Sequence, residues 1–214
     1  MSLRPALWVA PSLPAPGDEA LLDPGERARR DRLLREEDRQ EFAAAHVFLR
    51  RCLSRCAPVS PQAWRFAREE GGRPVVAGPA EGLDLRFSLS HAAGWVAVAV
   101  ARAGPVGVDL ERIGRVHDPL GTAAGFFSPG ERAALARHEG PARDRHFAER
   151  WCLKEAWAKA LGGGLDLPVE RAEFSVGADG AIALALPAEL GRGEAWRFEL
   201  FEPAPGWVGA LCWG

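Results

Sequence analysis

Two acidic residues near the middle of the chain have the type and spacing that suit chemistry. Asp109 and Glu111 lie two residues apart in GPVGVDLERI, whose alternating valine and leucine residues predict a strand. Side chains at i and i+2 of a strand share a face, so these two carboxylates lie side by side. Because neighbouring carboxylates repel each other, a cation, a proton, a basic neighbour or solvent must offset the repulsion. The pair indicates either a cation site or a solvated edge strand.

A predicted helix further along the chain holds both of its lysines. The segment WCLKEAWAKALGGG contains Lys154 and Lys159, whereas the rest of the 27 Lys and Arg residues are arginines. In a helix Trp151, Glu155 and Lys159 form one stripe with Lys154 beside it, and the three glycines then end the helix. Glu155 and Lys159 could form an ordinary surface ion pair, but arginine would serve equally there. Because lysine differs from arginine in its compact ammonium that can lose a proton, we predict chemistry for both lysines.

The three carboxylates of these two segments predict a metal site. Asp109, Glu111 and Glu155 offer hard oxygen ligands beside an ammonium group. Mg²⁺ takes few protein carboxylates and completes its coordination with water and substrate phosphate. A bound Mg²⁺ can neutralise the charge that develops on a phosphate leaving group. We therefore expect Mg²⁺-dependent chemistry on a phosphate ester.

The first half of the chain supplies basic residues that suit an anion. Arg29 belongs to the arginine-rich segment GERARRDRLLRE, and Arg73 lies between a Gly-Gly turn and a proline that fix its backbone. Ser90 and His91, in FSLSHAAGW, lie at a turn between two predicted strands and can donate hydrogen bonds. A solvated helix face and a structural Ser-His pair are the alternatives for these residues.

The elements that carry these residues are predicted to occur twice. DPGERARRDRL, from Asp23, is echoed by SPGERAALARH, from Ser128, and both read as an N-cap residue followed by Pro and a capping-box Glu. DRQEFA is echoed by DRHFAE, and RFSLSHAAGWVAVAV by RFELFEPAPGWVGAL, in the same order and at nearly the same offset. Three echoes in register indicate an internal duplication.

The duplication predicts an α+β fold of two pseudo-twofold-related halves. Each half reads as a short strand, then helices of which the second is long, then two strands joined by a turn. Each would form a small, mainly antiparallel sheet packed against its long helix. We place the boundary between residues 1–103, with the basic residues, and residues 104–214, with the acids and the lysine helix. A cleft between related halves is the expected ligand site.

Composition narrows the class of protein. With 214 residues and 47% hydrophobic residues the chain can bury a substantial core, and its net charge of −2 offers no general attraction to nucleic acid or an anionic membrane. Apolar runs stay well short of the roughly 20 residues of a membrane span, and the N-terminus is a poor signal peptide. Of the four cysteines, Cys52 and Cys56 are expected to pack in a helix core. We therefore expect a reduced, cytoplasmic protein without nucleic-acid or membrane partners.

The two chemical segments together resemble the signature of a known family. GVDLE, followed some forty residues later by WCLKEAWAKALGGGL, is similar to the surfactin-type 4′-phosphopantetheinyl transferases, whose pattern is G-[IV]-D-x-E and then F-x-x-x-W-x-x-K-E-[AS]-x-x-K-x-x-G. The similarity extends to GGRP, FSLSH and FFSPGE. The residues that match the second part of the pattern are Phe147, Trp151, Lys154, Glu155, Lys159 and Gly162.

The resemblance implies a reaction and roles for these residues. The enzyme would transfer the phosphopantetheine arm of coenzyme A to a serine of an apo acyl or peptidyl carrier protein and release adenosine 3′,5′-bisphosphate. By this resemblance Asp109, Glu111 and Glu155 would bind Mg²⁺, and Glu155 would act as the base. Lys159 would contact the phosphate, with Lys154 in a supporting role. The residues that would contact coenzyme A are Arg73, Ser90, His91 and Arg29.

Departures from the family and other functions remain open at this point. Arg73 replaces a frequent lysine, and Glu26 and Gly125 occupy positions that are often basic in the family. A metal-dependent phosphodiesterase or nuclease would use similar acids, and a non-catalytic module could bind coenzyme A or the carrier. The natural carrier is not readable from the sequence. We expect a monomer, because the duplication already supplies two halves.

Overall fold

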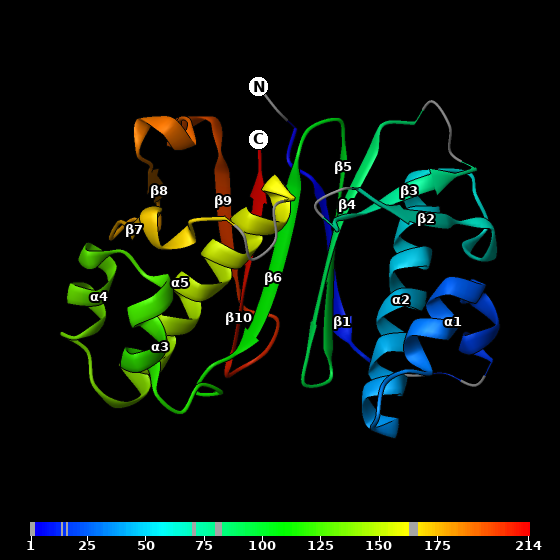
Figure 1. Cartoon of the computed structure of the whole chain (residues 1–214), viewed down its shortest axis with the longest axis horizontal. Coiled ribbons are helices and arrows are strands. Elements are labelled where there is room, and N and C mark those ends of the chain that lie inside the picture. Colours follow the sequence, from blue (N-terminus) through cyan, green and yellow to red (C-terminus); the bar gives the residue numbers. More distant parts are fainter. Residues whose placement is uncertain (1–2, 14, 16, 70–71, 80–82, 163–166) are drawn as a thin grey trace.

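The chain runs twice through a similar order of elements (Figure 1). The computed structural model describes residues 3–13, 15, 17–69, 72–79, 83–162 and 167–214. The elements of the N-terminal half are β1 (Ala6–Pro11), α1 (Pro24–Arg30), α2 (Glu36–Cys56), β2 (Arg65–Arg68), β3 (Pro74–Gly78), β4 (Leu85–Ala92) and β5 (Trp95–Arg102). Those of the C-terminal half are β6 (Val106–Arg112), α3 (Pro119–Phe126), α4 (Pro129–Leu135), α5 (Gly140–Leu161), β7 (Glu173–Val176), β8 (Ile182–Ala185), β9 (Arg197–Phe201) and β10 (Trp207–Trp213). Short 3₁₀ turns lie at Asp18–Leu21, Pro61–Ala63, Val169–Arg171, Ala188–Leu190 and Gly193–Ala195.

Both halves build the same sheet. Strands pair antiparallel in the order β1-β5-β4 in one half and β6-β10-β9 in the other, and each half adds a hairpin, β2-β3 or β7-β8. The sheets face each other at the centre of the molecule, with α2 and α5 on the outer sides (Figure 1). This arrangement confirms the predicted α+β fold of two related halves, each an antiparallel sheet packed against a long helix.

The predicted helix starts form in both halves through local hydrogen bonds. Asp23 accepts a bond from the backbone N–H of Glu26, whose carboxylate in turn accepts from the Asp23 N–H. Ser128 and Glu131 make the same reciprocal pair before α4. Each motif satisfies two backbone donors that a helix start leaves without partners. These capping boxes confirm the first of the three sequence echoes as a structural repeat.

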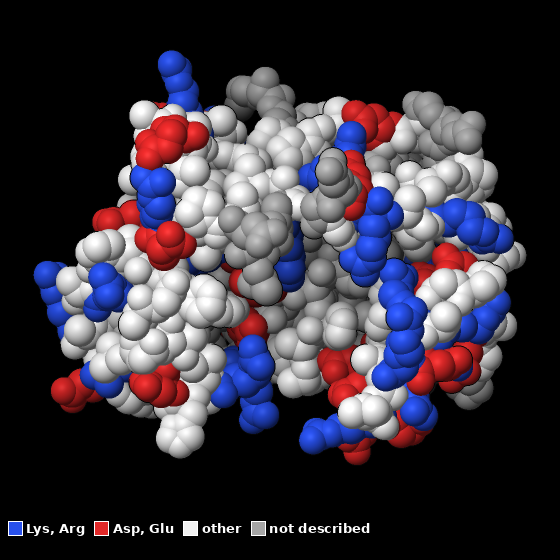
Figure 2. All heavy atoms as spheres, viewed as in Figure 1, with Lys and Arg blue, Asp and Glu red and all other residues white. Residues whose placement is uncertain are grey.

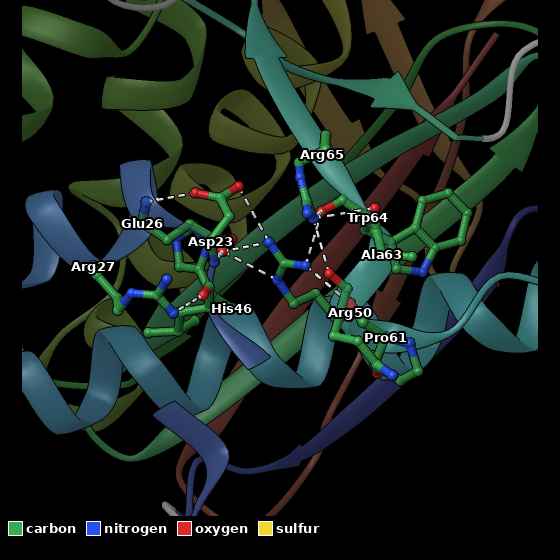
Figure 3. A network of polar contacts seen from close by, with 11 residues as sticks. Asp23, Glu26, Arg27, His46, Arg50, Pro61, Ala63, Trp64 and Arg65 are labelled. Carbon is green, nitrogen blue, oxygen red and sulfur yellow. Dashed lines mark hydrogen bonds and ion pairs between the residues drawn. The ribbon is translucent and has the colours of Figure 1, made fainter. Parts of the chain in front are cut away.

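In the N-terminal half the capping glutamate also anchors a buried cation (Figure 3). Glu26 of α1 and Arg50 of α2 are both fully buried, and Arg50 Nη2 lies 2.5 Å from the Glu26 carboxylate. Arg50 Nη1 donates to the carbonyl oxygens of Pro61 and Trp64, at 2.9 and 3.0 Å, and its guanidinium lies over the Phe66 ring. A buried charge needs such complete pairing. The network ties α1, α2 and the entry to β2 together, which explains the acidic residue at position 26.

A shared core joins the halves. Buried residues of β5, β6 and β10 form one apolar cluster, in which Val108 is fully buried. The hydroxyl of Ser88 on β4 accepts a hydrogen bond from the Val108 N–H at 3.0 Å. Cys52 is buried in the core beside α2 and Cys56 packs against it, as predicted. In the part of the chain that the structure describes, no helix is long and apolar enough to span a membrane.

Gly107 sets how closely the strand with the acids approaches the lysine helix. A Cβ atom at this position would lie 1.8 Å from the carbonyl oxygen of Ala156 on α5. Only a residue without a side chain allows this approach. The close contact brings the carboxylates of β6 against the helix face that carries Glu155 and Lys159.

Candidate active site

A cavity of about 490 Å³ opens between the two halves. Its wall is formed by side chains of α1, α2, the β2-β3 hairpin and β4 from the N-terminal half, and by the C-terminal turns of α5 with Gly162 from the other half. Among the described residues of the wall, cationic side chains outnumber acidic ones, of which there is one, and most of the others are apolar. Figure 2 shows basic side chains along the border between the halves on this face. The polar side chains lining the cavity are Arg29, Arg68, Arg73, Lys159, His46, His91, Ser88 and Glu155.

Asp109 lies buried at the centre of the acidic cluster. It is 5% exposed, and its Oδ1 accepts hydrogen bonds from Lys159 Nζ at 2.6 Å and from Ser90 Oγ at 2.9 Å. Its Oδ2 is buried and has no hydrogen-bond partner among the residues that the structure describes. Buried polar atoms are rarely left without a partner, so this oxygen is available to a ligand.

Burial and neighbouring acids both raise the pKa values of Glu111 and Glu155. Burial raises the pKa of Glu155, repulsion from Asp109 and Glu111 raises it further, and Lys159 opposes the rise. Burial also raises the pKa of Glu111, against the effect of its hydrogen bonds with Arg115. The three carboxylates therefore form one electrostatically coupled cluster across β6 and α5.

The acidic cluster fits a cation, although its ligands are not yet assembled. The described residues include no group of three or more His, Cys, Asp or Glu side chains that could hold a metal ion as they stand. Glu111 accepts bonds from Arg115 at 2.9 and 3.0 Å, and Lys159 occupies one oxygen of Asp109. The free Asp109 oxygen and the repulsion among the acids nevertheless suit a hard cation.

The ammonium of Lys159 bridges the acidic cluster and the cavity. Besides Asp109 it contacts the carbonyl oxygen of Val108 at 3.2 Å, and its side chain is 31% exposed. It therefore pairs with the adjacent strand β6 and does not form the helical ion pair with Glu155. A compact ammonium suits this position between a strand carbonyl and a carboxylate.

The basic wall of the cavity comes from α1, α2, the β2-β3 hairpin and β4. The Arg29 guanidinium lies 5.9 Å from the centre of the Phe42 ring, which stacks on His46. Arg29 Nε is buried and has no hydrogen-bond partner in the described part of the chain. His91 lies 3.8 Å from Glu41, and burial lowers its pKa more than this carboxylate raises it. The cavity thus presents cationic and hydrogen-bonding groups to an anion.

Comparison with known proteins agrees with the motifs. Residues 105–212 match the family model of the 4′-phosphopantetheinyl transferase superfamily, and residues 18–103 match that of the 4′-phosphopantetheinyl transferase N-terminal domain. The chain belongs to the 4′-phosphopantetheinyl transferase superfamily. It is thus an enzyme that transfers 4′-phosphopantetheine from coenzyme A to carrier proteins, which confirms the resemblance.

The relatives of this transferase align over most of its length. The 4′-phosphopantetheinyl transferase HetI of Nostoc sp. is 30% identical over 193 residues, which cover 90% of this chain and 78% of HetI. The 4′-phosphopantetheinyl transferase Sfp of Bacillus subtilis is 26% identical over 193 residues, covering 90% of this chain and 82% of Sfp. A putative 4′-phosphopantetheinyl transferase of Synechocystis sp. is 32% identical over 164 residues, covering 76% and 66% of the two chains.

The structure separates Lys154 from the other predicted site residues of the transferase. Lys154 is 2% exposed and pairs with the buried carboxylate of Glu131 at 2.8 Å. Its ammonium also donates to the carbonyl oxygens of Val169 and Ala172, and it lies over the Phe174 ring. These contacts repeat those of Arg50 with Glu26 in the other half. These contacts give Lys154 a structural role, and its supporting role in catalysis stays a prediction from the resemblance.

Ser90 and Arg73 also differ from the expectation for free coenzyme A ligands of the transferase. The Ser90 hydroxyl donates to Asp109, and so orients that carboxylate. Arg73 lines the cavity, but its guanidinium pairs with Glu69 and donates to the carbonyl of Ala160. Gly162 ends α5, as predicted, and has the left-handed conformation. Gly163 and Gly164 lie outside the described residues.

Sequence reasoning missed several residues of the transferase cavity. His46 and Phe66 line it from α2 and β2, and Glu69 holds Arg73. Glu69 carried one usable signal, because it lies four residues before Arg73 across a Gly-Gly turn, where opposite charges pair in a hairpin. His46 and Phe66 gave no signal, since they belong to ordinary helix and strand patterns.

Proposed function

We propose that this transferase binds coenzyme A in the cavity between its halves and transfers the phosphopantetheine arm to a carrier-protein serine at the Asp109–Glu155 end. One observation carries the proposal: the basic wall from the N-terminal half and Glu155 and Lys159 of α5 line the same cavity. The cationic wall suits the phosphates of coenzyme A, and the apolar wall suits its organic parts.

Asp109, Glu111 and Glu155 would hold Mg²⁺ beside the pyrophosphate. When bound, Mg²⁺ supplies positive charge to the phosphate oxygens and to the leaving group. Ser90 supports the site by donating to Asp109 Oδ1, which leaves Oδ2 for the metal. Lys159 would neutralise phosphate charge from the cavity side.

Glu155 is the proposed base. Its carboxylate takes the proton of the serine hydroxyl as the serine oxygen bonds to the β-phosphorus of coenzyme A. The bond from that phosphorus to the bridging oxygen breaks, and adenosine 3′,5′-bisphosphate leaves with the oxygen. Burial and the neighbouring acids raise the pKa of Glu155 in the metal-free protein, and Mg²⁺ beside it would keep the carboxylate ionised for this proton transfer.

Arg29, Arg73 and His91 are the proposed contacts for the 3′-phosphate and neighbouring groups of coenzyme A. Their side chains line the cavity on the N-terminal side. The buried Arg29 Nε is available for such a contact. The monomeric state, the cytoplasmic location and the choice between acyl and peptidyl carriers stay predictions from the sequence.

Intact mass of an apo carrier protein tests the function. We expect incubation with the enzyme, coenzyme A and Mg²⁺ to add one phosphopantetheine, and Glu155→Ala to prevent the addition. Glu149→Gln, an acid of the same helix outside the cavity, is the matched control and should keep activity. No addition to fatty-acid, polyketide or peptide carriers by folded wild-type enzyme would overturn the proposal.

A further inference from the structure

Protein groups hold the guanidinium of Arg73 from two sides before any ligand arrives. Arg73 Nε and Nη2 donate to one oxygen of Glu69 at 2.9 and 2.5 Å. Arg73 Nη1 donates to the carbonyl oxygen of Ala160 at 3.1 Å, which links the β2-β3 hairpin to the end of α5. The guanidinium packs against Gly162, where a Cβ atom would lie 3.1 Å from its central carbon.

Glu69 occupies the edge of Arg73 that an anion prefers. Arginine can bind a carboxylate or a phosphate through two parallel N–H groups, and the Nε–Nη2 edge offers such a pair. A phosphate that enters the cavity therefore meets this edge already neutralised. It must share Arg73 through the remaining N–H groups or displace the carboxylate of Glu69.

Glu69 has a second cationic partner, which lowers the free-energy cost of displacing its carboxylate from Arg73. Its other oxygen accepts a hydrogen bond from Arg86 Nη1 at 3.3 Å, and Arg86 also contacts Asp84. The Glu69 side chain is 40% exposed, so water can solvate it as well. Moving from Arg73 to Arg86 would keep the carboxylate paired and hydrated throughout.

We propose that Glu69 is a built-in competitor for the phosphate of coenzyme A and thereby sets the affinity and anion selectivity of the cavity. In the free enzyme Glu69 holds Arg73 through its two-donor edge, and a bound phosphate displaces it toward Arg86. A ligand without a phosphate at this position leaves the pair intact. The inference rests on the proposed function, in which Arg73 binds a phosphate of coenzyme A.

Substitution of Glu69 tests this role. We expect Glu69→Gln to lower the Kd of adenosine 3′,5′-bisphosphate in calorimetry by about two- to fivefold, the range of an exposed ion pair. The KM for coenzyme A should fall similarly, without an increase in kcat. Asp84→Asn is the matched control, because it removes one negative charge that contacts Arg86 but not Arg73, and should leave the Kd unchanged.

The same Glu69 substitution in an Arg73 variant shows whether the change in affinity depends on Arg73. In an Arg73→Gln enzyme, Glu69→Gln should no longer tighten binding. Equal tightening in this background, or an unchanged or higher Kd for Glu69→Gln alone, would overturn the role of Glu69. Failure of wild-type enzyme to bind the bisphosphate or coenzyme A would instead overturn the proposed function. Thermal unfolding of each variant establishes that it is folded.

Discussion

At the scale of single residues, the acidic cluster of the site works against the stability of the free protein. Glu155 and Glu111 have raised pKa values because they are partly buried and face Asp109 across β6 and α5. Groups placed for chemistry in this way keep unfavourable interactions that a structural site would have removed. Lys159 offsets only part of the repulsion, through one oxygen of Asp109.

Glu155→Gln should therefore lose activity and gain stability. We expect carrier modification to fall by at least about a hundredfold, the usual contribution of a general base. The unfolding temperature without metal should rise at neutral pH. A raised pKa means that the folded state holds its proton longer, so the ionised wild type loses stability as pH rises through that pKa.

The gain from Glu155→Gln should consequently vanish in acid, where Glu155 is protonated in both states. Thermal unfolding at several pH values measures this difference. Added Mg²⁺ should raise the unfolding temperature of the wild type more than that of the variant. A variant that is less stable than the wild type at neutral pH would show that the acidic cluster is not strained.

At the scale of elements, the two halves fix their long helices by the same device. A capping glutamate, a cation from the long helix, two backbone carbonyls and an aromatic ring form the network in each half. The cation is Arg50 in α2 and Lys154 in α5. The network sets the position of α5, which also carries Glu155 and Lys159.

Replacing Lys154 should therefore lower the stability of the enzyme more than its kcat. Lys154→Met leaves the buried Glu131 without its partner, and we expect a loss of about 3–5 kcal/mol in the free energy of unfolding, measured in urea. Lys154→Arg should lose less, because Arg50 fills the equivalent position, and should keep kcat within a few-fold. A stable Lys154→Arg enzyme with kcat reduced more than tenfold would support the predicted catalytic role of Lys154.

The approach of β6 to α5 gives a second prediction at this scale. Gly107→Ala places a methyl group against the α5 backbone, and neither element can yield without moving the carboxylates. We expect a loss of about 3 kcal/mol or more in stability, together with loss of activity. Gly125→Ala is the control, because its Cβ meets nothing within 4 Å and alanine favours a helix. Tolerance of Gly107→Ala would contradict the described packing.

The elements also show why some features are readable from sequence and others are not. The capping boxes at Asp23 and Ser128 and the carboxylates of β6 follow local patterns, and the structure has them as predicted. The direction of the Lys154 side chain does not follow from a local pattern. Because α5 is buried around most of its circumference, helical spacing cannot identify the face of α5 that meets solvent. The partners of Ser90 and Arg73 lie in other elements, and only the tertiary fold brings them together.

At the scale of the whole molecule, the halves depend on each other. The central apolar cluster takes residues from both, including Ala99 of β5 and Val108 of β6. Arg4, just before edge strand β1 of one sheet, makes a two-bond pair with Glu199 of edge strand β9 of the other, at 2.7 and 2.8 Å. The cavity exists only where the halves meet, so binding and folding are linked.

We therefore expect that neither residues 1–103 nor residues 104–214 fold stably when expressed alone. Each fragment would expose its part of the shared core to water. Co-expression should restore a complex that binds coenzyme A, measured by calorimetry after joint purification. A fragment that unfolds cooperatively by itself would show that the proposed boundary separates independent domains.

The division of cations described above has a practical consequence for covalent labelling. Arginines carry the surface positive charge, Lys154 is 2% exposed, and Lys159 is 31% exposed at the cavity. Apart from the terminal amine, an amine-acylating reagent should therefore modify the folded enzyme at Lys159 alone. Peptide mass mapping would locate the label, and coenzyme A should protect against it. Mild acylation would then serve as a selective probe of the active site. Most proteins would instead be labelled over their whole surface.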